Sequence, residues 1–157
     1  MAKIAVISDS HWGRVRLEMF ARIAREEQFD AVIHCGDGLS DAKWLEKNLP
    51  MEVRYVAGNC DPRWSCDREL RCTFETVRML AVHGDLYNVK YDLCPLSYYA
   101  EEAGAQVALF GHTHEPCACY VGKVLMVNPG ALKDGRYAVL RIENGQTTPY
   151  LKEFLKD

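Results

Sequence analysis

The first 60 residues alternate between two patterns of apolar and polar positions. Continuous apolar runs at residues 3–8, 31–35 and 53–57 are typical of buried strands, and each is followed by a glycine or aspartate turn signal. Between them, residues 15–28 place most of their apolar side chains near one helical face, and a second helix is predicted from about residue 40 to 48. Because strands and helices alternate, these elements predict a parallel sheet with crossover helices.

Patterns typical of strands dominate the rest of the chain. Residues 70–84 predict two extended segments, residues 95–104 a short helix and residues 106–111 another buried strand. Four further β-like runs are separated by glycine, proline and Asn-Gly turn signals and predict antiparallel sheet: residues 119–122, 123–128, 136–142 and 148–154. The sequence contains no internal repeat, low-complexity tract or linker. We therefore predict a single domain over residues 1–157.

Composition narrows the function classes. The chain has 157 residues, 48% of them apolar, which is enough for one compact core. Its net charge of -3 provides no broad basic field, so a stable nucleic-acid complex is not expected. No apolar run is long enough to span a bilayer, and the first residues do not form a signal-peptide pattern. The seven cysteines lack a framework spacing, which favours reduced thiols and a cytoplasmic location without membrane association.

Residues able to bind metal ions follow the predicted strands, just past the end of each apolar run. Seven positions share this placement: Asp9, His11, Asp37, Asn59, His83, His112 and His114. Since such strand ends line one edge of an α/β sheet, the seven side chains are expected to converge. Imidazole combined with carboxylate or amide oxygen suits zinc, manganese, iron or nickel. Taken singly, each has an ordinary alternative: the aspartates cap helices, Asn59 makes a turn and His83 packs in the core. His34 fits no ligand position and is assigned to the core or to the surroundings of the site.

These residues form five ordered motifs that resemble those of the calcineurin-like metallophosphoesterase superfamily. The motifs are Asp9-Ser10-His11, Gly36-Asp37, Gly58-Asn59-Cys60-Asp61, His83-Gly84 and Gly111-His112-Thr113-His114. The resemblance covers Lys3 to about Ala131 and is strongest to the small bacterial and archaeal phosphodiesterases, which contain little more than the catalytic sandwich. It implies an α/β fold: a four-layer αββα sandwich with two packed mixed β-sheets flanked by helices.

The resemblance also implies roles for individual residues. Asp9, His11 and His114 match the ligands of one divalent ion, while Asn59, His83 and His112 match those of a second ion. Asp37 matches the carboxylate that bridges the two ions, and Asp37, Asn59 and His112 are the expected catalytic residues. Manganese is the expected metal, with zinc, iron or nickel as alternatives. A hydroxide held between the ions would attack a phosphodiester. The substrate is expected to be a small phosphate ester; a nucleotide-derived substrate is one option, and its identity stays open.

Two positions depart from the superfamily pattern. Cys60 stands where many members have a histidine that assists the leaving oxygen. Because a thiol is a poor general acid, we expect diesters or activated esters to be preferred over alkyl phosphomonoesters. Trp12 is inserted between His11 and the following glycine, which displaces the turn by one residue. Trp12 and Trp64 are candidates for stacking on an aromatic group or, equally, for filling a gap.

Three arginines are candidates for contacts to an anionic substrate, although an exposed surface role is the commoner one for arginine: Arg14, Arg63 and Arg68. Two alternative functions remain. A non-catalytic scaffold of the retromer-subunit type shares the fold but has lost ligand positions, and none is lost here. A structural zinc site would use His112, His114, Cys117 and Cys119, but its two ligand pairs are too close in sequence for usual zinc spacings. A homodimer is the expected oligomeric state.

Overall fold

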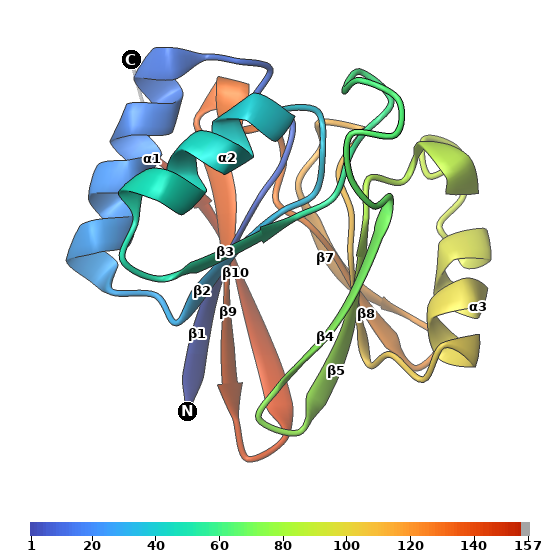
Figure 1. The fold of residues 1–157 in the computed structure, drawn as a ribbon. Helices are drawn as coiled ribbons and strands as arrows, with labels where there is room; N and C mark the ends of the chain where they lie inside the picture. Colours follow the sequence, from blue (N-terminus) through green and yellow to red (C-terminus); the bar gives the residue numbers. More distant parts are fainter. Residues whose placement is uncertain (155–157) are drawn as a thin grey trace.

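The computed structural model describes residues 1–154 and contains two five-stranded sheets packed face to face (Figure 1). The first sheet has the spatial order β10 (Gln146–Glu153), β9 (Arg136–Glu143), β1 (Ala2–Ile7), β2 (Ala31–His34) and β3 (Glu52–Tyr55). The second has the order β4 (Glu69–Phe74), β5 (Val77–Val82), β6 (Val107–Leu109), β8 (Val124–Asn128) and β7 (Cys117–Val121).

Both sheets are mixed. In the first sheet β1, β2 and β3 are parallel, as the alternating pattern predicts, whereas β9 joins β1 antiparallel and pairs with β10 as a hairpin. In the second sheet β5, β6 and β8 are parallel, and β4 and β7 pair antiparallel at the two edges. The antiparallel pairing predicted for the C-terminal runs is therefore confirmed, although β8 also has a parallel neighbour.

The helices cover the outer faces of the two sheets, on opposite sides of the molecule (Figure 1). They comprise α1 (Arg14–Glu27), α2 (Leu39–Asn48) and α3 (Cys94–Glu102), together with two 3-10 turns, η1 (Asp85–Tyr87) and η2 (Leu132–Asp134). One buried cluster joins the two sheets, a second joins the first sheet to α1 and α2, and a third joins the second sheet to α3. These layers are the predicted αββα sandwich.

Helix α1 shows how the apolar pattern produces this packing. Leu17, Phe20, Ala21 and Ala24 recur at three- and four-residue spacing and are fully buried against the first sheet. The helix ends where Gln28 adopts a left-handed conformation and donates its backbone N–H to the Ala24 carbonyl. The face that the sequence makes apolar is thus the face that the sheet covers.

The parallel strands of both sheets direct their C-terminal ends to the same end of the sandwich. In the first sheet, β3 leaves its ladder at Tyr55, earlier than the predicted 57, because the Ala57 N–H bonds to Asp67 instead. The loops that follow these strands carry the predicted ligand positions. Of the predicted domain, residues 155–157 lie outside the described range, and the domain boundary itself stays a prediction. Among the described helices, none has the length and apolar character needed to cross a membrane.

Replacing Leu109 with alanine tests the role of the core between the sheets. Leu109 lies in β6 and is fully buried there, so Leu109→Ala is expected to lower the free energy of unfolding by about 2–5 kcal/mol. Leu86→Ala is the control, because that leucine is 69% exposed. Chemical denaturation measures both variants; equal losses would contradict the packing described here.

Candidate metal centre

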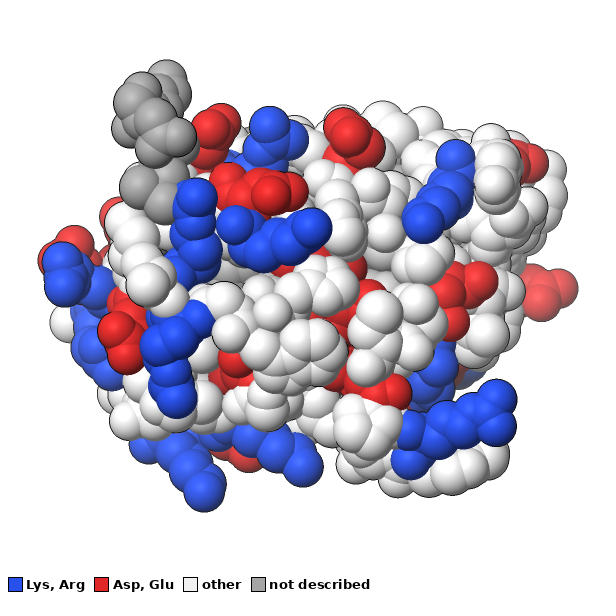
Figure 2. All heavy atoms as spheres, turned by 90° about the horizontal axis from the view of Figure 1, so that it is seen from above, with Lys and Arg blue, Asp and Glu red and all other residues white. Residues whose placement is uncertain are grey.

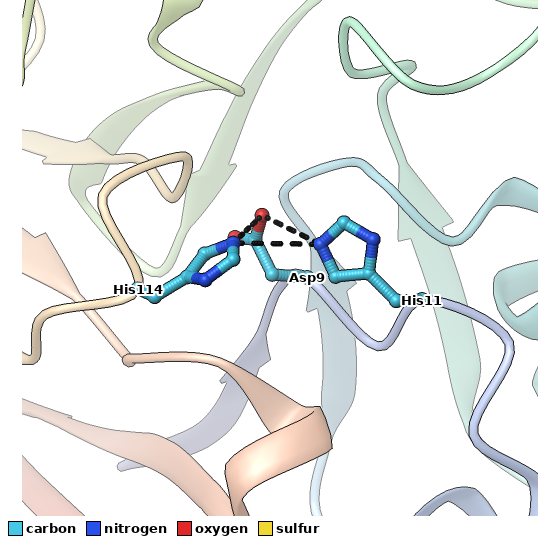
Figure 3. A group of neighbouring side chains, drawn as sticks. All are labelled: Asp9, His11 and His114. Atoms are coloured by element: carbon cyan, nitrogen blue, oxygen red, sulfur yellow. Dashed lines mark hydrogen bonds and ion pairs between the residues drawn. The ribbon is translucent and has the colours of Figure 1, made fainter.

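Asp9, His11 and His114 converge from two loops at the end of the sandwich (Figure 3). Nε2 of His114 lies 3.1 Å from Oδ1 of Asp9, and Nε2 of His11 lies 3.5 Å from the same oxygen. The two Nε2 atoms are 3.4 Å apart. Two nitrogens bound to one tetrahedral ion at 2.0–2.1 Å are separated by roughly 3.3 Å. The three side chains therefore have the spacing of ligands around a single ion.

A second group consists of Asp9, Asp37 and His83, all of them buried. His83 donates its Nδ1–H to the carbonyl of Cys35 at 2.8 Å, so Nε2 is the nitrogen that faces the carboxylates; burial lowers the pKa of His83, but Asp37 and Asp9 more than reverse this and raise it. That Nε2 atom is buried and has no hydrogen-bond partner among residues 1–154, although it lies 3.1 Å from Oδ2 of Asp37. A histidine fixed by a backbone carbonyl on one nitrogen and free on the other is the usual arrangement of a metal ligand.

Asp37 lies between His83 of this second group and His11 of the first group. Its Oδ2 atom is 3.1 Å from Nε2 of His83 and 3.9 Å from Nε2 of His11, while Oδ1 accepts the backbone N–H of Cys60 at 2.8 Å. Burial alone raises the pKa of Asp37, but His83 and the hydrogen bonds from Cys60 more than reverse this and hold that pKa well below its usual range. Asp37 is therefore a carboxylate at neutral pH, the form that binds cations.

His112 and Asn59 are less closely engaged than the other five predicted ligands. The His112 ring lies 5.1 Å from the His83 ring, and its backbone N–H donates to Oδ2 of Asp9 at 3.0 Å. Burial lowers the pKa of His112, and the nearby His83 adds to this effect, so the neutral form that binds metals is favoured. Asn59 is exposed, and its amide contacts the Cys60 sulfur at 3.7 Å. In the described part of the chain, the Asn59 side chain makes no hydrogen bond to the other ligand positions.

Backbone strain is concentrated at this site. Five of the seven predicted ligand positions adopt a positive φ, a region that residues other than glycine rarely occupy: Asp9, His11, Asp37, His112 and His114. Such conformations cost roughly 1–3 kcal/mol each and persist only where the surroundings enforce them. The loops are thus held in the arrangement that turns these side chains inward.

Two glycines allow the loops to approach closely. A Cβ atom on Gly58 would lie 2.2 Å from Oδ1 of Asp37, and one on Gly111 would lie 2.5 Å from Oδ2 of Asp9. Both distances are far below van der Waals contact, so any side chain at these positions would displace a carboxylate. The glycines of the Gly-Asn and Gly-His motifs are needed because the backbone packs directly against the acidic groups.

Asp61 is the main residue that the sequence interpretation missed. It is buried and accepts four backbone N–H groups at 2.8–3.1 Å: those of Asp37, of Gly38, of Leu39 at the start of α2, and of Gly58 in the next loop. One carboxylate therefore ties the loop that carries Asp37 to the loop that carries Asn59. The only signal in the sequence is its place at the end of the Gly58-Asn59-Cys60-Asp61 motif, to which no role was assigned.

Asn128 provides a similar link on the second sheet. Its amide group donates to the Gly111 carbonyl at 3.1 Å and to the Thr113 hydroxyl at 2.9 Å, which fixes the loop that carries His112 and His114. Its side-chain oxygen accepts the N–H of Gly130 at 2.9 Å. Asn128 lies within the stretch that the resemblance covers, but outside the five motifs that carry it.

His34 is fully buried, as predicted. Its Nδ1 accepts the N–H of Gly36 at 3.0 Å, so Nε2 carries the proton and donates to the Ser10 hydroxyl at 2.9 Å. Burial lowers the pKa of His34 to about 4, so the ring is neutral at physiological pH. His34 thus supports the loop between Asp9 and His11 without joining the ligand groups.

The candidate substrate residues have different surroundings. Arg68 pairs with Asp85, and the Arg14 guanidinium lies 5.0 Å from the Trp44 ring centroid, whereas Arg63 is exposed. Trp12 and Trp64 are exposed, which excludes the gap-filling role for both. Figure 2 shows the end of the sandwich where β1 ends: acidic atoms are visible among uncharged residues, with most Lys and Arg farther out.

The structural zinc alternative is not supported. Cys117 and Cys119 project from one face of β7, as the sequence predicts, with their sulfur atoms 4.0 Å apart. His114 instead points to Asp9. Among the described residues, none of the groups of three or more metal-capable side chains includes either cysteine. The four residues of the structural zinc alternative therefore do not converge.

The sandwich, with candidate metal ligands clustered at one end, is the arrangement expected of a metal-dependent phosphoesterase. The chain matches the calcineurin-like phosphoesterase superfamily domain over residues 2–145 and belongs to this family. It is 36% identical over 153 residues to a probable metallophosphoesterase of Bacillus subtilis, with 92% of this chain and 87% of that protein covered. It is 27% identical over 143 residues to a phosphodiesterase of Methanocaldococcus jannaschii, with 82% of each covered.

Solved structures support the same architecture. A predicted phosphoesterase from Streptococcus pneumoniae has a TM-score of 0.81 and 28% identity, with 97% of this chain and 89% of that one covered. A Vps29 from Entamoeba histolytica, crystallised with zinc, has a TM-score of 0.74 and 18% identity, with 96% and 98% covered. The second likeness concerns the fold alone, so it is compatible with the scaffold alternative without favouring it.

Removing the Asp61 carboxylate tests whether it positions the metal ligands. Asp61→Ala leaves four buried N–H groups without their acceptor and is expected to weaken metal binding about 10- to 100-fold. Isothermal titration with Mn²⁺ measures the change. Asp67→Ala, which removes an exposed carboxylate from the same loop, serves as the control. Unchanged affinity in Asp61→Ala would contradict this role.

Proposed function

We propose that this protein is a dinuclear metal-dependent phosphodiesterase. The observation that carries the proposal is the position of Asp37, whose carboxylate oxygen lies within 3.9 Å of His11 Nε2 on one side and 3.1 Å of His83 Nε2 on the other. Asp37 thus reaches one histidine of each proposed ion site, and a carboxylate placed in this way is the feature needed to hold two ions close together. The phosphodiesterase relative from Methanocaldococcus jannaschii supports this reaction class.

The seven ligand positions divide between two ions in this proposal. Asp9, His11 and His114 hold one ion, Asn59, His83 and His112 hold the other, and Asp37 is shared. The histidines are suited to manganese, which we favour, and also to zinc, iron or nickel. Two bound divalent ions would lower the pKa of a water molecule between them and neutralise charge on the phosphate. Four positive charges against Asp9 and Asp37 leave the site attractive to an anion.

The chain's own residues supply orientation and electrostatics. The hydrogen bond from His83 to Cys35 directs the free nitrogen inward, and the low pKa of Asp37 keeps its carboxylate charged. Asp37, Asn59 and His112 are the residues we place at the reacting phosphate. Asn59 is exposed, and its amide contacts the Cys60 sulfur at 3.7 Å.

Cys60 favours diesters in this proposal. Burial raises the pKa of the Cys60 thiol, and the neighbouring Asp37 carboxylate adds to this shift. The thiol is therefore protonated at neutral pH and, as a weak hydrogen-bond donor, gives little help to an alkoxide leaving group. Esters with good leaving groups need less help.

We further propose a small phosphate-ester substrate, a cytoplasmic location and a homodimeric state.

Asp37→Asn tests the shared carboxylate. The variant keeps the size of the side chain but removes its charge, so we expect bound manganese to fall from about two ions per chain and hydrolysis of bis(p-nitrophenyl) phosphate to be lost. Elemental analysis and a colorimetric assay measure the two effects, with Asp67→Asn as the exposed control. Full activity in Asp37→Asn, or in metal-free wild-type protein, would refute the proposed mechanism.

Cys60→His tests whether the thiol causes the proposed preference for diesters over alkyl phosphomonoesters. Imidazole is a better proton donor than a thiol at neutral pH, so the variant is expected to gain at least about tenfold in kcat/KM for an alkyl phosphomonoester. Diester hydrolysis should change less. Cys60→Ser, which also lacks an effective general acid, is the matched control. An equal gain in both variants would show that loss of the thiol, rather than proton donation by the new side chain, determines the preference.

A further inference from the structure

Trp12 is an exposed aromatic residue beside the metal centre. It directly follows the ligand position His11, and the two ring centroids are 6.0 Å apart in an edge-to-face arrangement. The indole is 48% exposed although it is among the most apolar side chains of the protein. The inserted residue therefore neither fills a gap nor joins any of the three cores.

The backbone holds this ring in place at an energetic cost. Trp12 has a φ of 60° and follows His11 at 46°, so two successive bulky residues adopt the left-handed conformation. The Trp12 N–H donates to Oδ2 of Asp41 at 2.9 Å, and Asp41 is itself buried at the start of α2. Gly13 closes the same turn through an N–H bond to the Ser10 carbonyl at 3.0 Å. The backbone that carries the exposed ring is thus fixed at both ends of the turn.

Arg14, the arginine nearest to Trp12 in sequence, is engaged by a different aromatic ring. The Arg14 guanidinium lies over the Trp44 ring at 5.0 Å, where α2 keeps it. Beside a centre suited to binding phosphate, this loop presents a flat apolar surface. A phosphate ester that also carries a planar aromatic group matches both features, because its ring can stack on the indole while its phosphate binds at the metal centre.

We propose that Trp12 forms a stacking subsite for the aromatic part of the substrate, and that the substrate class is a nucleotide-type phosphodiester. This inference rests on the proposed function, because the metal centre supplies the phosphate-binding half. A sugar phosphate or inorganic phosphate has no planar ring and gains nothing from Trp12. The subsite would therefore distinguish nucleotide esters from other small phosphate esters.

Binding of two product-like probes tests the proposal without relying on turnover. Manganese-loaded protein is titrated with adenosine monophosphate and with inorganic phosphate by calorimetry. Stacking of one base is expected to make the nucleotide bind about 5- to 100-fold more tightly than phosphate. Trp12→Gly accepts the left-handed turn and removes only the ring, so it should abolish this difference while leaving phosphate affinity unchanged. Trp12→Phe should retain most of it.

The outcomes separate this inference from the proposed function. Loss of the nucleotide advantage in Trp12→Gly, with Tyr120→Ala unaffected as an exposed aromatic control, supports the subsite whether or not diesters are hydrolysed. Equal affinities for both probes in wild-type protein would overturn it, as would an advantage that persists in Trp12→Gly. Failure of adenosine monophosphate to bind would also overturn it. Hydrolysis of diesters without any nucleotide advantage would leave the proposed function intact and refute the role of Trp12.

Discussion

Two buried carboxylates, Asp9 and Asp37, impose the constraint that shapes the loop end of this molecule. An ionised group removed from water is costly unless opposite charge and hydrogen bonds compensate for the lost hydration. Here the compensation comes from histidine nitrogens and from backbone N–H groups of loops on both sheets. Divalent cations would complete it. The two sheets therefore depend on each other at this end, since neither one carries both the acidic groups and all of their partners.

The supporting residues follow from this constraint. Asp61 and Asn128 each join separate loops through hydrogen bonds, and His34 fixes the turn after β1. These buried polar groups hold backbone conformations that would otherwise relax, including the left-handed residues at five ligand positions. The apolar layers beneath supply a rigid base, because packed cores transmit strain instead of absorbing it. The packing and the hydrogen bonds thus stabilise strained backbone conformations at one end of the sandwich, where the candidate metal ligands lie.

The relatives place this arrangement in a wider context. The same sandwich occurs in phosphoesterases and in Vps29, so the architecture alone does not specify an activity. What distinguishes members is the set of side chains at the strand ends and the loops around them. In this chain the ligand positions are filled, while Cys60 and Trp12 alter the groups next to them. In the proposed function, substrate preference would therefore depend on these two loop residues more than on the fold.

Much of the structure was accessible from the sequence because its signals are local. Apolar periodicity predicted α1 and the parallel strands, and ordered motifs predicted the sandwich and the ligand positions. Other features were decided only by tertiary structure. The pairing of β9 with β1, the four N–H groups gathered by Asp61, the free nitrogen of His83 and the exposure of Trp12 all depend on contacts between segments far apart in the chain. Residue type and spacing specify which groups are available, whereas burial and the direction of each hydrogen bond arise only when the two sheets pack together.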